Sequence, residues 1–180
     1  MKGIVFSLFN QYVESKIGLV GWENILSTVK PESEGIYTSA ATYSDEELVA
    51  LIVAFAKSQK QEVNEVLQDF GYFMFNCFVK KYPIFFKPDM DLKSFLKSVD
   101  SVIHIEVRKL YSDSTLPELT YEEPADKNLI INYRSPRKMC HLAEGLIQGA
   151  ADHFEQNIVM QQTECMHHGQ NRCRFDIHFQ

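Results

Sequence analysis

The chain has 180 residues, 45% of them hydrophobic, and a formal net charge of −6. This length and apolar content suffice for one well-packed core, and the negative charge disfavours binding to nucleic acid. No apolar run approaches the ~20 residues that a membrane-spanning helix needs, so we expect one cytoplasmic domain over residues 1–180 with no membrane partner. Four cysteines are too few for a secreted disulfide scaffold and indicate reduced thiols or a metal site.

The first two thirds of the chain predict helices, over about residues 1–115. Ser44 and Glu47 form a capping-box pattern before apolar residues at helical spacing. A second helical stripe starts at Val63, becomes apolar nearly all round near Cys77, and should end before Pro83. We interpret Cys77 as an inert core residue. Residues 91–111 predict one helix or two abutting helices.

The pattern changes in the last part of the chain, over about residues 116–180. Two short strands are expected around a turn at 124–127. Ser135 suits an N-cap and Pro136 the first position of a helix that continues to Phe154. A hairpin is predicted around Gly169, because apolar and polar residues alternate after it. The layout predicts an α+β fold, with a helical N-terminal part packed on a C-terminal part that holds a small antiparallel sheet and helices.

His104 lies between apolar neighbours, so we expect it to face a dry interior. The simpler interpretation is a satisfied core histidine. As a ligand, one neutral imidazole in an apolar cavity is what haem iron needs, since the porphyrin supplies the equatorial ligands. The two propionates would need an arginine and hydroxyl donors, and Tyr133, Ser135 and Arg137 form such a set. The simpler interpretation of that corner is a capped helix start with a solvated arginine.

These residues, in this order, resemble the haem nitric oxide/oxygen binding (H-NOX) family, bacterial relatives of the haem domain of soluble guanylate cyclase. The resemblance covers essentially the whole chain. It rests on "MKGIVFSLF" at the start, His104, "LYSDSTLPEL" at 110–119, the Y-x-S-x-R pattern of Tyr133, Ser135 and Arg137, and "AEGLIQGAADHF" at 143–154.

The resemblance implies a role for each of these residues. His104 would be the proximal ligand of haem b, buried between the two parts of the chain. Tyr133, Ser135 and Arg137 would bind the propionates, and Pro117 would pack against the porphyrin and help to distort it. A gas that weakens the iron–histidine bond would let the ring relax and so move the N-terminal helices.

The distal pocket decides which gas binds. Oxygen-binding members of the family have a tyrosine five residues after the motif arginine, and this chain has Leu142 there. With Val5 and Phe9 as further pocket neighbours, we expect no hydrogen-bond donor. The prediction is a ferrous haem that binds nitric oxide and carbon monoxide and largely refuses oxygen.

Three cysteines raise a second question, because Cys140, Cys165 and Cys173 match three zinc ligands of a subset of this family. Three thiols and a histidine make a tetrahedral zinc site. Where that subset has its histidine, this chain has Gln162, which is a poor zinc ligand. The fourth ligand stays open among the nearby histidines, with His168 placed first; the others are His141 and His167. The alternatives are three reduced thiols, or a redox sensor in which zinc release accompanies disulfide formation.

No paired carboxylates, serine–histidine pair or glycine-rich phosphate loop stands out, so we predict that the protein is not an enzyme. The leading hypothesis is a haem-based nitric oxide sensor that signals by contact to a histidine kinase or a cyclic-di-GMP synthase or hydrolase in a separate chain, as the resemblance implies. The main rival is a zinc- or thiol-based redox-sensing or small-ligand module without haem. A haem enzyme is disfavoured, since the expected distal side offers no acid or base.

Overall fold

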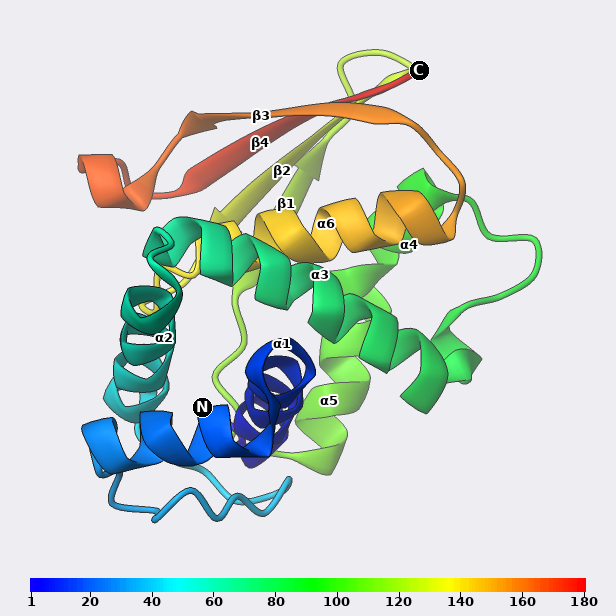
Figure 1. Cartoon of the computed structure of the whole chain (residues 1–180). Helices are drawn as coiled ribbons and strands as arrows, with labels where there is room; N and C mark the ends of the chain where they lie inside the picture. Colours follow the sequence, from blue (N-terminus) through cyan, green and yellow to red (C-terminus); the bar gives the residue numbers. More distant parts are fainter.

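The computed structural model describes residues 1–180 (Figure 1). Along the chain, five α-helices precede the strands of an antiparallel sheet. The predicted α+β class is confirmed. None of the helices combines the length and the apolarity needed to cross a bilayer. In chain order the elements are α1 (Gly3–Val29), α2 (Asp45–Gln59), α3 (Val63–Lys81), α4 (Leu92–Ser98), α5 (His104–Leu110), β1 (Glu118–Glu122), β2 (Asn128–Arg134), α6 (Cys140–His153), β3 (Ile158–Glu164) and β4 (Cys173–Phe179).

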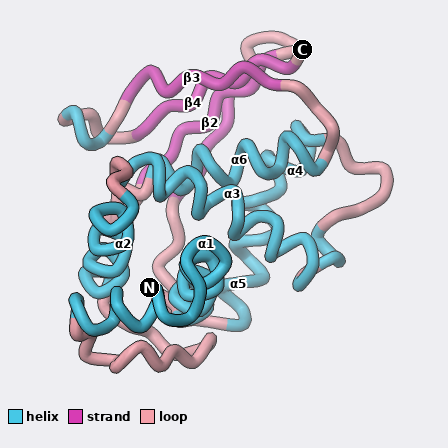
Figure 2. The backbone as a smooth tube through the Cα atoms, viewed as in Figure 1, coloured by secondary structure: helices cyan, strands magenta, loops and turns pink.

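The four strands form one sheet in the order β1-β2-β4-β3, with every neighbouring pair antiparallel. Figure 2 shows the strands gathered on one side of the molecule and the helices on the other. The predicted hairpin is confirmed, and Gly169 in its turn has the positive φ of 86° that glycine adopts without steric cost. Tyr133 pairs with Leu119 on one side and with Cys173 on the other.

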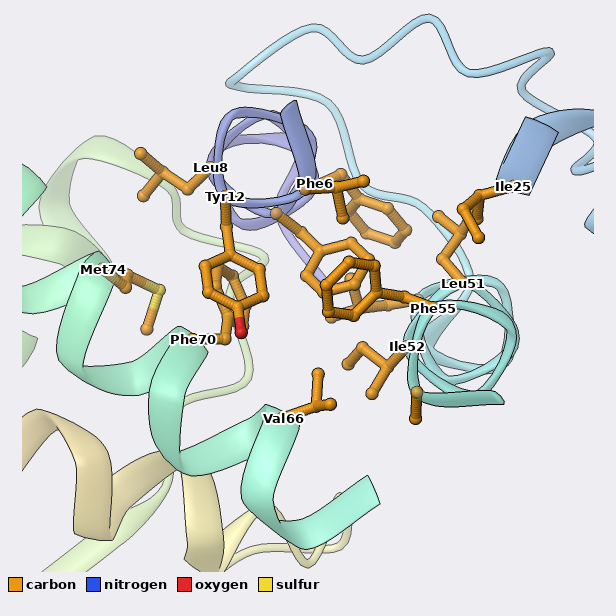
Figure 3. Packing of buried hydrophobic residues seen from close by; sticks show 14 of the residues in the cluster. Phe6, Leu8, Tyr12, Ile25, Leu51, Ile52, Phe55, Val66, Phe70 and Met74 are labelled. Atoms are coloured by element: carbon orange, nitrogen blue, oxygen red, sulfur yellow. The ribbon is translucent and has the colours of Figure 1, made fainter. Parts of the chain in front are cut away.

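One hydrophobic cluster fills the space between α1, α2 and α3. Phe6 and Tyr12 of α1, Phe55 of α2 and Phe70 of α3 are each at most 1% exposed. Figure 3 shows these side chains converging from the three helices. Truncating a buried aromatic ring of this kind to alanine costs about 3–5 kcal/mol, so these contacts determine how α1 is held.

A second cluster lies between the sheet and α6, which runs beneath it in Figure 1. Leu129 and Ile131 of β2 and Phe175 and Ile177 of β4 point inward, each at most 4% exposed. The alternation of apolar and polar residues predicted this face correctly. α6 also packs along α3, so this helix pair joins the sheet to the helical part.

The helix start predicted at Ser44 is confirmed, but its capping box is not formed. The Ser44 hydroxyl accepts a hydrogen bond from the Glu46 amide. The Glu47 carboxylate accepts hydrogen bonds from the hydroxyls of Ser33, at 2.6 Å, and Tyr37, at 2.8 Å. Partners outside the helix therefore replace the local contact that the pattern predicted.

The helix predicted to begin at Pro136 begins at Cys140, so that prediction is wrong. Residues 135–138 form a turn in which the Lys138 amide donates to the Ser135 carbonyl at 3.1 Å. Lys138 has a φ of 50°, which interrupts any helix through it. Proline suits the second position of a β-turn as well as the first position of a helix, and here the turn is formed.

Candidate functional site

His104 lies at the junction between a widened turn and α5. α4 continues into a π-helical turn, Val99–Ile103, and the His104 amide donates to the Val99 carbonyl across it. The imidazole is 12% exposed, and its Nδ1 lies 3.1 Å from Oδ1 of Asp100. Burial lowers the pKa of His104, although the contact with Asp100 opposes the change. The imidazole is therefore neutral near pH 7, and Nε2 has no hydrogen-bond partner.

The surroundings of His104 are apolar but only partly buried. α5 contains no fully buried residue, and Val102 and Ile105 on either side of the histidine are 48% and 42% exposed. Apolar side chains next to a neutral imidazole provide the chemistry that a porphyrin ring and its iron require. The residues around His104 thus fit a haem.

The corner after β2 brings together Tyr133, Ser135 and Arg137. Tyr133 and Ser135 are 5% and 2% exposed. The Ser135 hydroxyl accepts a hydrogen bond from the Arg137 amide at 3.3 Å. Burial raises the pKa of the Tyr133 hydroxyl, which therefore stays protonated and able to donate. The turn described above, rather than a helix start, holds this set in place.

The Arg137 guanidinium contacts two distant segments. Its Nη1 donates to the Thr115 carbonyl at 2.5 Å, and its Nε lies 2.8 Å from Oδ2 of Asp45, the first residue of α2. The same carboxylate pairs with the N-terminal ammonium of Met1 at 2.6 Å. Burial alone would raise the pKa of Asp45, but the hydrogen bond from the ammonium and the positive charge of Arg137 hold it below its usual range.

Two polar atoms near this corner are buried without a hydrogen bond. One is Nε of Arg137, whose approach to Asp45 is close enough for an ion pair but lacks hydrogen-bond geometry. The other is Oγ of Ser114, next to Thr115. Buried polar atoms are rarely left unpaired, and both are donors that carboxylate oxygens satisfy. The donor set therefore fits the propionates of a haem.

Pro117 occupies the segment between α5 and β1. It is half-buried and directly precedes Glu118, the first residue of β1. The segment runs from α5, which carries His104, past Thr115, whose carbonyl binds Arg137. Pro117 thus lies on the chain that links the expected iron ligand to the propionate corner.

Val5, Phe9 and Leu142, the expected distal residues, belong to one hydrophobic cluster. Phe9 is fully buried, and its ring lies 5.1 Å from that of Phe70. Leu142 and Val5 pack against the cluster as half-buried residues. All three side chains are apolar, so none donates a hydrogen bond.

Tyr12, which the sequence did not single out, contributes a hydroxyl to this neighbourhood. Its ring centroid is 6.0 Å from that of Phe9. It also lines a surface cavity of about 410 Å³ together with Lys16 and Asp69. Burial, together with the charge of Asp69, raises the pKa of Tyr12 to about 12.

Three cysteines from separate elements converge on one buried point. The Sγ atoms of Cys140, Cys165 and Cys173 all lie within 4.8 Å of one another. The Cys140–Cys165 separation is 3.9 Å, close to the roughly 3.8 Å edge of a tetrahedron with zinc–sulfur bonds of ~2.3 Å. Burial raises the pKa of Cys140 to about 12 and also raises that of Cys173. Zinc binding here would therefore release protons.

No histidine belongs to this cysteine cluster. The side-chain amide of Gln162 donates to the Glu164 carbonyl at 3.3 Å, and Gln162 lies near the Cys140 thiol. His168 lies in the exposed turn between β3 and β4. His167 contacts the Lys138 carbonyl at 2.7 Å, and His141 contacts Glu144 at 2.7 Å. The three thiols are brought together, whereas the fourth position stays open.

Comparisons with known proteins agree with this arrangement. A family model described as "Haem-NO-binding" matches residues 2–162. An H-NOX protein from S. oneidensis in the Fe(II)NO ligation state is 32% identical with a TM-score of 0.93, covering 100% of this chain and 99% of that chain.

Two further structures extend the comparison. The unliganded Fe(II) H-NOX protein from K. algicida is 30% identical with a TM-score of 0.88, covering 100% of this chain and 97% of that chain. A mutant H-NOX structure from T. tengcongensis, at 24% identity and a TM-score of 0.89 over 100% of this chain and 98% of that one, supports the fold alone. No curated protein matches the sequence.

Proposed function

Because this chain belongs to the Haem-NO-binding family of gas-sensing haem domains, we propose that it is a nitric oxide sensor that holds haem b through His104. The haem, when bound, supplies a ferrous iron with a coordination position for nitric oxide or carbon monoxide. The S. oneidensis protein, which is similar over its whole length, has structures in the Fe(II)NO and Fe(II)CO ligation states. They support the same ligands here.

One observation carries the assignment of His104. Its Nδ1 is held by Asp100 while its Nε2 is free, and apolar residues flank it. A histidine that binds a metal through one ring nitrogen almost always donates the other N–H to a carboxylate, carbonyl or water. The imidazole is thus fixed in the tautomer and orientation that a ligand needs.

Tyr133, Ser135 and Arg137 would hold the propionates. The two hydroxyls would donate to carboxylate oxygens, and the guanidinium would supply the positive charge. Pro117 would press on the porphyrin from the segment before β1. The Ser114 hydroxyl, which is buried without a hydrogen bond, supports a carboxylate in this corner.

Val5, Phe9 and Leu142 would select the gas. An apolar distal side leaves the partial negative charge of oxygen without a hydrogen bond, whereas nitric oxide and carbon monoxide depend less on one. We therefore propose little oxygen binding. Tyr12 lines the surface cavity together with Lys16 and Asp69, so we assign its hydroxyl no role in holding the gas.

The contacts of Arg137 would relay a change at the site to the N-terminal helices. This residue contacts Asp45 at the start of α2, and Asp45 holds the N-terminal ammonium just before α1. A shift of the guanidinium would therefore alter the contacts at the start of both helices. The signal would pass in the cytoplasm to a separate histidine kinase or cyclic-di-GMP synthase or hydrolase, and the chain itself would not be an enzyme.

A second candidate function belongs to the cysteine cluster. The convergence of Cys140, Cys165 and Cys173 within 4.8 Å supports a zinc site or a thiol redox sensor. The site joins α6 to both arms of the last hairpin, so metal binding would stiffen that end of the sheet. The fourth ligand would come from solvent or from His168, because Gln162 is a poor zinc ligand.

Gas titrations of the purified protein test the main proposal. The protein is reduced without oxygen and exposed separately to nitric oxide, carbon monoxide and air. We expect the haem Soret band to shift with the first two and to stay unchanged in air over the time of the scan. A stable shift in air would overturn the selectivity, and no shift with nitric oxide would overturn the sensor.

A further inference from the structure

Asp100 has a single polar side-chain partner, and that partner is His104. Oδ1 of Asp100 lies 3.1 Å from Nδ1 of His104, and the carboxylate makes no ion pair with a lysine or arginine. Arg108 lies one turn beyond His104, and the Tyr121 hydroxyl lies near the Asp100 backbone. The imidazole is thus the only side chain that makes a hydrogen bond with the Asp100 carboxylate, whose charge also acts on Tyr121.

The backbone between the two residues is unusual. Residues Val99–Ile103 form a π-helical turn that ends at His104. π-Helical turns are rare, and they occur frequently at functional sites. Across this turn a carboxylate and an imidazole four residues apart lie in contact, with the imidazole 12% and the carboxylate 34% exposed.

We propose that Asp100 is a positioning residue that accepts the Nδ1–H hydrogen bond of His104 and strengthens the bond from Nε2 to the haem iron. This inference rests on the proposed function of His104 as the proximal ligand. A charged acceptor makes a stronger hydrogen bond than a neutral one. Negative charge drawn onto the ring raises the basicity of Nε2, as outer-shell partners of metal-bound histidines do.

Asp100 would thereby control how readily the iron–histidine bond weakens. A stronger bond favours the ferric over the ferrous state and resists release of the histidine. Asp100 would therefore set the threshold at which a gas is sensed, in addition to fixing the ring. Loss of a merely structural contact would alter folding or haem content but would not shift the strength of this bond in a defined direction.

Resonance Raman spectra of the ferrous, gas-free holoprotein measure the iron–histidine stretching frequency directly. Asp100→Asn keeps the size of the side chain and removes its charge, so we expect a lower frequency and a more positive haem reduction potential. We also expect haem to transfer faster to an acceptor protein, because removal of outer-shell partners typically weakens metal binding by about 10- to 100-fold. Asp100→Glu should restore part of each change.

Glu106→Gln is the matched control, because Glu106 lies on α5 and pairs only with exposed Lys109 at 2.6 Å. It should leave frequency and potential unchanged. If Asp100→Asn fails to fold, Asp100→Ser gives the same test. Normal haem content with an unchanged frequency in either variant would overturn the role of Asp100 and leave the sensor proposal intact. A wild-type protein that takes up no haem would overturn both.

Discussion

Gly71 of α3 and Gly145 of α6 face each other where the two helices cross, and neither has space for a side chain. A Cβ on Gly71 would collide with the Leu142 carbonyl oxygen, and a Cβ on Gly145 would collide with the Gln68 carbonyl oxygen. The two backbones therefore pack directly against each other. Since Leu142 is one of the expected distal residues, this crossing also sets how close that part of α6 lies to α3.

Gly145→Ala should destabilise the protein. Helix propensity alone favours alanine by about 0.5–1 kcal/mol, but overpacking costs about 1–3 kcal/mol, and the obstructing atom is backbone that cannot rotate away. We expect a net loss of about 1–2 kcal/mol in the free energy of unfolding, measured by denaturant titration. Gln148→Ala on the exposed side of α6 should change stability by less than about 0.5 kcal/mol. Equal stability of Gly145→Ala and wild type would contradict the close crossing.

Asp45→Asn should weaken the link between the propionate corner and the N-terminus. The folded pKa of Asp45 lies below its ordinary value of 3.8. The carboxylate therefore adds stability that is fully present above about pH 3.8 and is lost as the pH falls through the folded pKa. Because the side chain is 36% exposed, we expect a loss of only about 1 kcal/mol at pH 7.

Measurements of stability across pH separate the loss of this charge interaction from a general destabilisation of the fold. The stability difference between wild type and Asp45→Asn should shrink below pH 3.8 and with added salt. Asp89→Asn, an exposed carboxylate without an ion pair, should show no such difference at either pH. A difference that persists at low pH would rule out the charge of Asp45 as its cause.

Much of the fold could be predicted because its determinants are local. The apolar stripe after Val63 and the stop at Pro83 predicted α3 within a residue. The alternation of Phe175, Ile177 and Phe179 predicted the inner face of β4. The spacing of apolar residues and the residues that end a helix are features of a few neighbouring positions, so they can be recognised from the sequence alone.

The parts that were missed depend on contacts between distant segments. The partners of Glu47 and the salt link from Arg137 to Asp45 join residues far apart in sequence, which no local pattern reports. Pro136 is compatible with both a turn and a helix start, and tertiary contacts selected the turn. The contact between Asp100 and His104, by contrast, could have been predicted, because a spacing of four residues places two side chains on one face of a helix.

Leu142→Tyr should raise the affinity of the reduced protein for oxygen. A hydroxyl at this position would supply a donor, and a hydrogen bond to a charged group contributes about 1.5–3 kcal/mol. That corresponds to roughly a 10- to 100-fold tighter affinity, measured by anaerobic titration with oxygen. Leu142→Phe has the same ring without the hydroxyl and should stay close to wild type. Equal oxygen affinity in the two variants would place residue 142 outside the gas pocket.

The cysteine cluster predicts bound zinc in the purified protein. Elemental analysis should find close to one zinc per chain in wild type, and much less in Cys140→Ser, Cys165→Ser or Cys173→Ser. Gln162→His should tighten zinc binding by adding an imidazole beside Cys140. Chelator competition measures that change.

Cys77→Ser is the matched control for this prediction. Cys77 lies on α3 outside the cluster and is half-buried, so its loss should not alter zinc content. If wild-type protein prepared under reducing conditions holds no zinc, the cluster is a set of free thiols and the redox interpretation alone is left.

Replacement of the proposed iron ligand tests the account most directly. The absorption spectrum of reduced His104→Gly would be compared with those of wild type and His178→Ala, which removes an exposed histidine from β4. We predict that His104→Gly loses the histidine-ligated haem spectrum, that added imidazole restores it, and that His178→Ala keeps it. A wild-type spectrum in His104→Gly without imidazole would show that His104 is not the ligand and would contradict the central claim.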